Sequence, residues 1–196
     1  MPETLTTICD NAFLGCSGLK EITIPKDCKT IGKDAFYNCS GLEEISVEKE
    51  NPVFDSRKDC KALIDSKSNT LLQGGKNSVV PDGVTEIGEY AFAYTGITEI
   101  TIPDSVIKIG EKAFNDCKQL RSVVLPANIT SIGDNTFMLC SSLETVKLPE
   151  GLKTIGAGAF SGCSSLQAVT IPAAVDSIGN VAFSSCKSLT EIVIPK

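Results

Sequence analysis

The chain has 196 residues, of which 42% are apolar and 21% charged, and this balance excludes a disordered chain and a membrane-embedded one. Its formal net charge is −6 and it has no basic stripe, so neither nucleic acid nor an anionic membrane surface is an expected partner. It has no histidine, which removes the usual general base at neutral pH and the commonest transition-metal ligand.

Residues 1–47 contain two similar units, which begin at Pro2 and Pro25. Residues 1–7 have neither the basic start nor the apolar core of a signal peptide. Each unit ends in the pattern Leu-x-x-Ile-x-Ile or a close variant, as in residues 19–24. Because apolar and polar residues alternate over its last four positions, the pattern predicts a short strand with one face turned inward. Pro25 ends the first strand, since proline donates no ladder hydrogen bond.

Residues 48–80 form an irregular unit of 33 residues, where the regular unit has 23. Two apolar stretches, residues 61–65 and 70–73, flank a cluster of turn-forming residues at 66–69. This order predicts a β-hairpin at about 61–73, which we expect to project from the regular coil outline. Because long loops often carry function, the unit is expected to be the functional or geometric irregularity of the chain. Cys60, inside it, is the thiol expected to be most exposed.

The rest of the chain is its most regular part. A unit one residue short begins at Pro81, and Pro103 opens a series of prolines that recur 23 residues apart, up to Pro195, which would open a ninth unit. Each full unit has Ile-Gly at the sixth and seventh positions after the proline, Phe at the eleventh, Cys at the fourteenth and Leu at the seventeenth. The glycine predicts a bend, and the Ala-Phe-x-x-Cys stretch predicts a helical turn.

A repeat of this length indicates a solenoid, because one unit is too small to bury its own apolar face and must stack on its neighbours. We therefore predict one elongated domain, residues 1–196, of about eight coils that begin near residues 2, 25, 48, 81, 103, 126, 149 and 172. Neither end of the chain shows an evident polar cap. End-to-end association with another copy, or continuation into a longer array, is therefore expected as well.

The combined pattern Leu-x-x-Ile-x-Ile-Pro-x-x-Val-x-x-Ile-Gly-x-x-Ala-Phe-x-x-Cys resembles the BspA-type leucine-rich repeat of bacterial surface proteins and some protozoan ones. The resemblance implies a leucine-rich-repeat solenoid, a right-handed curved superhelix with a parallel β-sheet on one face and short turns or helical turns on the other. It also implies a secreted or cell-surface protein that binds proteins or adheres to host or neighbouring cells. The family motif consists of framework positions, so the resemblance brings no catalytic residues and no cofactor.

Two columns of repeated side chains are predicted to be core rather than functional sites. In-register cysteines on coils about 5 Å apart cannot bring their Cβ atoms to the roughly 3.8 Å of a disulfide, and a column does not converge four metal ligands. The fourteenth-position cysteines, expected to be reduced and buried, are Cys16, Cys39, Cys117, Cys140, Cys163 and Cys186. The eleventh-position phenylalanines are Phe13, Phe36, Phe92, Phe114, Phe137, Phe160 and Phe183.

The polar positions of the predicted strands do not belong to the repeated core pattern, so their side chains can carry function. The exposed sheet face is the surface that repeat proteins commonly use for binding, although an ordinary solvated sheet would look the same. The candidate partner-binding residues are Glu21, Thr23, Glu44, Ser46, Glu99, Thr101, Arg121, Lys147, Thr170 and Glu191. No pair of carboxylates suits glycosidase chemistry, because an open face does not raise a pKa, so no enzyme is expected.

The leading hypothesis is therefore a non-enzymatic interaction or adhesion module that binds an unknown protein or glycan. The first alternative is a structural spacer arm of a longer surface protein. The second, less favoured, is an accessory segment of a carbohydrate-active protein. A convergent carboxylate pair or an aromatic on the sheet face would favour the second alternative.

Overall fold

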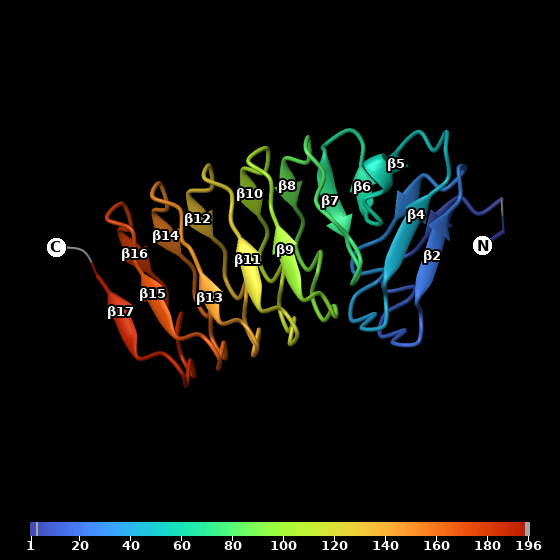
Figure 1. Cartoon of the computed structure of the whole chain (residues 1–196). Helices are drawn as coiled ribbons and strands as arrows, with labels where there is room; N and C mark the ends of the chain where they lie inside the picture. Colours follow the sequence, from blue (N-terminus) through green and yellow to red (C-terminus); the bar gives the residue numbers. More distant parts are fainter. Residues whose placement is uncertain (3, 195–196) are drawn as a thin grey trace.

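The computed structural model describes residues 1–2 and 4–194, so the ninth unit expected from Pro195 lies outside the described residues. The chain is a β-solenoid of about eight coils stacked along one axis, with the two ends of the chain at opposite ends of the stack (Figure 1). Among the described residues the single helix is the 3-10 helix η1 (Arg57–Asp59). The predicted solenoid is confirmed.

The longer strands form one side of the stack and come from the Leu-x-x-Ile-x-Ile segments. Ile22 pairs with Ile45, and Ile100 with Val123, in parallel register, and all four side chains are buried. The polar residues between them point outward, as the alternation predicts. These strands, which have three or four residues except for the two-residue β13, are β2 (Glu21–Ile24), β4 (Glu44–Val47), β9 (Glu99–Thr101), β11 (Ser122–Val124), β13 (Thr145–Val146), β15 (Ala168–Thr170) and β17 (Glu191–Val193).

A second set of two-residue strands lies behind the first (Figure 1). Each carries the isoleucine that precedes the seventh-position residue, which is glycine in all of them except the first, where it is Cys9. Parallel pairs such as Ile132 with Ile155 join successive coils. Both of these isoleucines are buried between the two strand layers. The short strands are β1 (Thr7–Ile8), β3 (Thr30–Ile31), β8 (Glu86–Ile87), β10 (Lys108–Ile109), β12 (Ser131–Ile132), β14 (Thr154–Ile155) and β16 (Ser177–Ile178).

The segment between the two strand layers is a chain of turns, and the predicted helical turn is wrong. In the fifth coil the N–H of Cys117 donates to the carbonyl of Phe114, but the N–H of Phe114 donates to Thr136 in the next coil (2.9 Å). Left-handed residues stop a helix from continuing, and they recur at the ninth and thirteenth positions after the proline. The ninth-position residues are Asn11, Asp34, Tyr90, Lys112, Asn135, Gly158 and Val181; the thirteenth-position residues are Gly15, Asn38, Tyr94, Asp116, Leu139, Gly162 and Ser185.

In most coils the glycine at the seventh position is required by the neighbouring coil, not by a bend; the exception is Gly133, where a Cβ would lie 3.5 Å from its nearest neighbours. A Cβ on Gly110 would lie 2.6 Å from the backbone nitrogen of Glu89, and one on Gly179 would lie 2.4 Å from that of Ala157. Neither glycine has a positive φ, so the predicted role of a permissive backbone is wrong here. The side chain is absent because two coils touch through their backbones at this point.

The phenylalanine column is core, as predicted. Phe92, Phe114, Phe137 and Phe160 are fully buried, with successive ring centroids 5.2–5.3 Å apart and ring planes within 10° of parallel. The first two coils have a separate pair, Phe13 and Phe36 (5.4 Å). Unit 48–80 has no phenylalanine at this position, so the stack is interrupted there, and the buried residues divide into two clusters on either side.

The hairpin predicted at 61–73 is confirmed, because β6 (Leu63–Asp65) and β7 (Thr70–Gln73) pair antiparallel. It does not project from the stack, and that prediction is wrong. Leu71 of β7 pairs in parallel with Ile87 of β8, so the hairpin takes the place of a short strand in the ladder. Strand β5 (Phe54–Asp55) adds to β6, and the guanidinium of Arg57 binds the hairpin tip through Asn69 (2.8 Å).

We expect Phe137→Ala to lower the free energy of unfolding by about 3–5 kcal/mol, the usual cost of truncating a fully buried aromatic side chain. Phe13→Ala should cost less, since Phe13 stacks on one ring only and is half-buried. Glu99→Ala, on the exposed sheet face, should stay within about 0.5 kcal/mol. Urea unfolding of the three variants checks this, and equal losses at Phe137 and Glu99 would mean that the faces are assigned wrongly.

Val181 is a β-branched residue held in the left-handed region, with a φ of 53°, and 66% of its side chain is exposed. Because glycine carries no penalty there, Val181→Gly should raise the free energy of unfolding by about 1 kcal/mol. Val181→Ala is the matched control: it removes the same methyl groups but keeps the strain. A gain that is equal in both variants, measured by urea unfolding, would contradict the explanation by backbone strain.

Candidate functional site

The ten candidate residues lie on the long strands or directly beside them, on the outward face. Glu44 is half-buried and the other nine are exposed. The parallel register places Glu21 opposite Glu44 and Thr23 opposite Ser46, whose hydroxyl oxygens are 2.8 Å apart. The face therefore presents rows of polar side chains that run across neighbouring coils, which is a geometry suited to an extended partner.

The acidic end of this face is held by ion pairs. Lys20 lies 3.1 Å from Glu43, and Lys61, which comes from the irregular unit, lies 2.7 Å from Glu44. The hydrogen bond from Lys61 lowers the pKa of the Glu44 carboxyl below its ordinary value. Glu44 is then ionised at neutral pH, so it can bind a cationic group but cannot act as a general acid.

A hollow interrupts the face where the irregular unit meets β9. Among the described residues no backbone hydrogen bond joins residues 76–80 to β9, which is the edge strand of its sheet. The hollow has a volume of about 540 Å³, and its lining includes Glu99 and Thr101 together with two exposed valines, Val79 (56%) and Val124 (57%). The choice of polar positions left both valines out; an apolar residue at an outward strand position was a signal for Val124, whereas Val79 lies outside the strands and had none.

The cysteine column has a role that the sequence did not show. From Cys39 onward, each thiol of the column donates a hydrogen bond to the phenylalanine carbonyl of an adjacent coil, as from Cys117 to Phe92 (3.0 Å) and from Cys140 to Phe114 (3.1 Å). In the fourth coil, Thr95 takes the place of the cysteine, and its hydroxyl donates to the carbonyl of Phe92 within the same coil (2.7 Å). A small side chain with a weak donor therefore fits this position better than a purely apolar one.

Two expectations about the thiols are corrected. Cys60, expected to be the most exposed, is completely buried, because its side chain belongs to the core and its thiol donates to the carbonyl of Ala62 (3.6 Å). The column is not buried throughout: Cys16 is exposed and Cys186 is half-buried, since each lies in a coil with a neighbour on one side. The other exposed thiol is Cys9.

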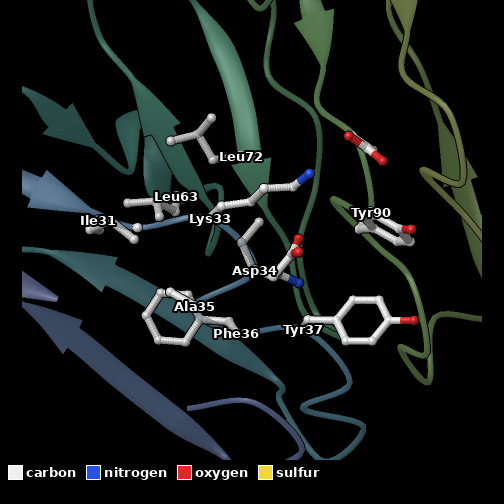
Figure 2. A pocket seen from close by; sticks show the side chains of 12 residues that line it. Ile31, Lys33, Asp34, Ala35, Phe36, Tyr37, Leu63, Leu72 and Tyr90 are labelled. Carbon is white, nitrogen blue, oxygen red and sulfur yellow. The ribbon is translucent and has the colours of Figure 1, made fainter. Parts of the chain in front are cut away.

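The stack of turn segments is also interrupted, between the second and fourth coils; this interruption is called the break below. All three tyrosines of the chain gather here: the Tyr37 ring meets the edges of the Tyr90 and Tyr94 rings at 4.9 and 5.2 Å, and the Tyr37 and Tyr94 hydroxyl oxygens are 3.0 Å apart. Burial raises the pKa of Tyr37, and the hydrogen bond with Tyr94 raises it further. Beside them is a cavity of about 220 Å³ with Leu63 and Leu72 on another wall (Figure 2).

Sequence reasoning missed this cavity because its residues are far apart in the chain. The absence of an Ala-Phe-x-x-Cys stretch, or a close variant of it, from residues 48–80 was the signal that could have found it, since all seven other coils have such a stretch as their turn segment. Among the described residues no three His, Cys, Asp or Glu side chains are grouped so as to hold a metal ion. In the same part of the chain, no helix has the length and apolar character that a membrane crossing requires.

Comparison with known proteins gives a consistent family. The pattern described as the BspA type leucine rich repeat region matches six copies, over residues 1–62 and 76–196, and omits most of the hairpin. No curated protein is similar enough to count as a relative. A leucine rich cell surface protein from Faecalibacterium prausnitzii is 31% identical with a TM-score of 0.85, and the match covers 98% of this chain and 52% of that one.

Two further solved structures share the fold. A leucine rich repeat protein from T. pallidum is 32% identical with a TM-score of 0.61, over 72% of this chain and 68% of that one. The pneumococcal vaccine antigen PcpA is 24% identical with a TM-score of 0.79, over 96% of this chain and 48% of that one, and shows the fold alone. The chain thus spans about half the length of the F. prausnitzii protein and of PcpA.

The buried thiols should make the fold sensitive to alkali. Burial raises the pKa of Cys163 to about 12, so the native thiol stays protonated while the unfolded one ionises near pH 9. The protonated Cys163 thiol therefore contributes its full stabilisation of the fold below pH 9, and this contribution is lost as the pH rises towards 12. Between pH 8 and pH 10.5, Cys163→Ser should therefore lose about 2 kcal/mol less stability than the wild type.

Urea unfolding at the two pH values measures the difference. The hydroxyl of the serine keeps the hydrogen bond to Phe137 that the thiol makes (3.1 Å) but does not titrate. Cys9→Ser, at an exposed thiol, is the control and should keep the alkaline loss of the wild type. An identical loss in all three proteins would show that Cys163 does not couple to folding.

Proposed function

Because the chain belongs to the BspA type leucine-rich-repeat family, we propose that it is a non-enzymatic interaction or adhesion module of a secreted or cell-surface protein. One solved relative, from Faecalibacterium prausnitzii, is described as a cell surface protein. The partner is a protein or glycan of a host or neighbouring cell. The observation that carries the proposal is the outward face of the long strands, where polar side chains stand in register across the coils without any role in the core.

Within this face, the hollow beside β9 is the proposed centre of contact. Exposed Val79 and Val124 offer apolar surface in the lining, while Glu99 of β9 and exposed Arg121, which directly precedes β11, offer opposite charges. An apolar centre with charged groups around it is the usual composition of a protein interface. The charges would set orientation and association rate, and the valines would supply burial.

The spacer-arm alternative has one observation in its favour. From Phe92 to Phe183 the rings form a continuous stack, which makes this part of the solenoid a uniform rod. A spacer needs only that rod, so its performance would not depend on the side chains of the outward face.

The test exchanges two charges on each side of the molecule. The double variant Glu99→Lys, Arg121→Glu alters the long-strand face, whereas Glu86→Lys, Lys108→Glu exchanges an ion pair of 2.7 Å on the short-strand side. Both variants keep the net charge. Beads coated with the chain are expected to adhere to cultured epithelial cells or to intact bacteria, and the first variant should reduce adhesion several-fold while the second leaves it unchanged. Equal adhesion by all three proteins would support the spacer arm.

A further inference from the structure

Backbone hydrogen bonds join the turn segments of neighbouring coils, and every second residue of a segment donates its N–H group to the next coil. From the first coil to the second, the N–H groups of Asn11 and Phe13 donate to Lys33 and Ala35 at 3.0 and 2.8 Å. The same positions of the second coil are Asp34 and Phe36 (the ninth and eleventh after Pro25), and their N–H groups face the irregular unit. That unit has no turn segment, and among the described residues neither N–H group has a hydrogen-bond partner.

The opposite wall of the break carries the complementary groups. In a complete ladder, the carbonyls of Glu89, Ala91 and Ala93 in the fourth coil would accept hydrogen bonds from the coil before it. Gly74 donates to Ala91 (2.8 Å) and so fills one of the three places. Within the described part of the chain, the carbonyls of Glu89 and Ala93 have no donor. The break thus presents unpaired donors on one wall and unpaired acceptors on the other.

The cavity of about 220 Å³ lies between these walls, and Asp34, Phe36 and Glu89 are among the residues that line it. In Figure 2, Ile31, Leu63 and Leu72 lie on one side, and the rings of Tyr37 and Tyr90 on the other. Since a water molecule takes about 30 Å³ of the liquid, the cavity has room for a few small residues of a chain but not for a whole coil.

The two tyrosines contributed by the fourth coil are held in an unfavourable backbone conformation. Tyr90 and Tyr94 have φ values of 59° and 64°, at the two left-handed positions where other coils often have Asn, Asp or Gly. A residue with a side chain loses roughly 1–2 kcal/mol there. The same positions are left-handed in every regular coil, so what is particular to the fourth coil is that tyrosines occupy both of them.

We propose that this break is a peptide-binding site, in which a short extended segment of a partner polypeptide replaces the part of the missing turn segment that precedes the place taken by Gly74. Its carbonyl oxygens would accept hydrogen bonds from the N–H groups of Asp34 and Phe36, and one of its N–H groups would donate to the carbonyl of Glu89. An apolar side chain of the segment would enter the cavity against Leu63 and Leu72. Main-chain hydrogen bonds supply affinity in this mode of recognition, and the side-chain pocket supplies selectivity.

A peptide fits the break better than a saccharide because it carries donors and acceptors in the same alternation as the ladder that is interrupted here. The site is separate from the long-strand face, so the two proposals succeed or fail independently. The chain itself provides a probe of the correct register: acetyl-Glu-Lys-Ala-amide repeats residues 111–113, the part of a regular turn segment that precedes the phenylalanine, whose place is taken by Gly74 here. By analogy with that coil, the lysine N–H of the peptide would reach Glu89.

Backbone amide hydrogen exchange, followed by NMR, tests the proposal in two steps. In the free protein, the amides of Asp34 and Phe36 should exchange faster than those of Lys112 and Phe114, which donate to the next coil. At a peptide concentration that occupies nine-tenths of the sites, exchange at Asp34 and Phe36 should slow about tenfold, because only the free fraction exchanges. The charge exchange at Glu99 and Arg121 should not alter this protection.

Two controls make the result specific. The same peptide with a methyl group on the lysine backbone nitrogen cannot donate to Glu89 and should give little protection. Leu72→Phe enlarges a side chain on the cavity wall and should also prevent protection, with unchanged exchange at Phe114 as the check that the variant is folded. The proposal is overturned if the peptide protects neither amide, if the methylated peptide protects them equally, or if cellobiose protects them and the peptide does not.

Discussion

Neighbouring coils of this solenoid touch at a spacing of little more than 5 Å, and every other feature of the structure is adapted to that spacing. A single coil has two very short strands and a run of turns, so it cannot satisfy its own backbone. The next coil supplies the missing hydrogen bonds and places a phenyl ring against its phenyl ring at 5.2–5.4 Å. The seventh-position glycine, the left-handed positions and the cysteine thiols all permit or complete this contact.

Periodicity made much of the fold predictable from the sequence. The inward isoleucines, the phenylalanine column and the hairpin followed from patterns within one unit. The roles of Gly110 and Cys117 did not, because each depends on which backbone atom of the adjacent coil lies opposite, and a repeat pattern does not reveal that. Cys60 was misplaced for the same reason: the irregular unit offered no register from which its neighbours could be inferred. The hairpin was predicted, but its position in the short-strand ladder was not, because that position depends on pairing with β8, which lies outside the irregular unit.

The candidate surfaces also divide into features that one unit of sequence predicts and features that depend on neighbouring coils. Outward exposure of residues such as Glu99 and Thr101 followed from strand alternation, and the structure places both beside a hollow. The hollow itself, with Val79 and Val124, arises because residues 76–80 do not pair with β9, and nothing within either segment reveals that. The tyrosine cavity likewise results from a missing segment. The hollow and the cavity of this chain therefore arise where the sequence departs from the repeat, not where it follows the repeat.

The divided core also has a mechanical consequence. Along most of the stack, a pulling force would be shared among bonds between turn segments, ring stacking, thiol hydrogen bonds and at least one of the two strand ladders. The long-strand ladder also stops between β13 and β15, and the short-strand ladder between β10 and β12. Across residues 48–80 the ring stack and the thiol series are interrupted, and the long-strand ladder stops before β9. Under tension along its axis, the solenoid would therefore yield first at this plane, and the coils on either side would separate as intact blocks.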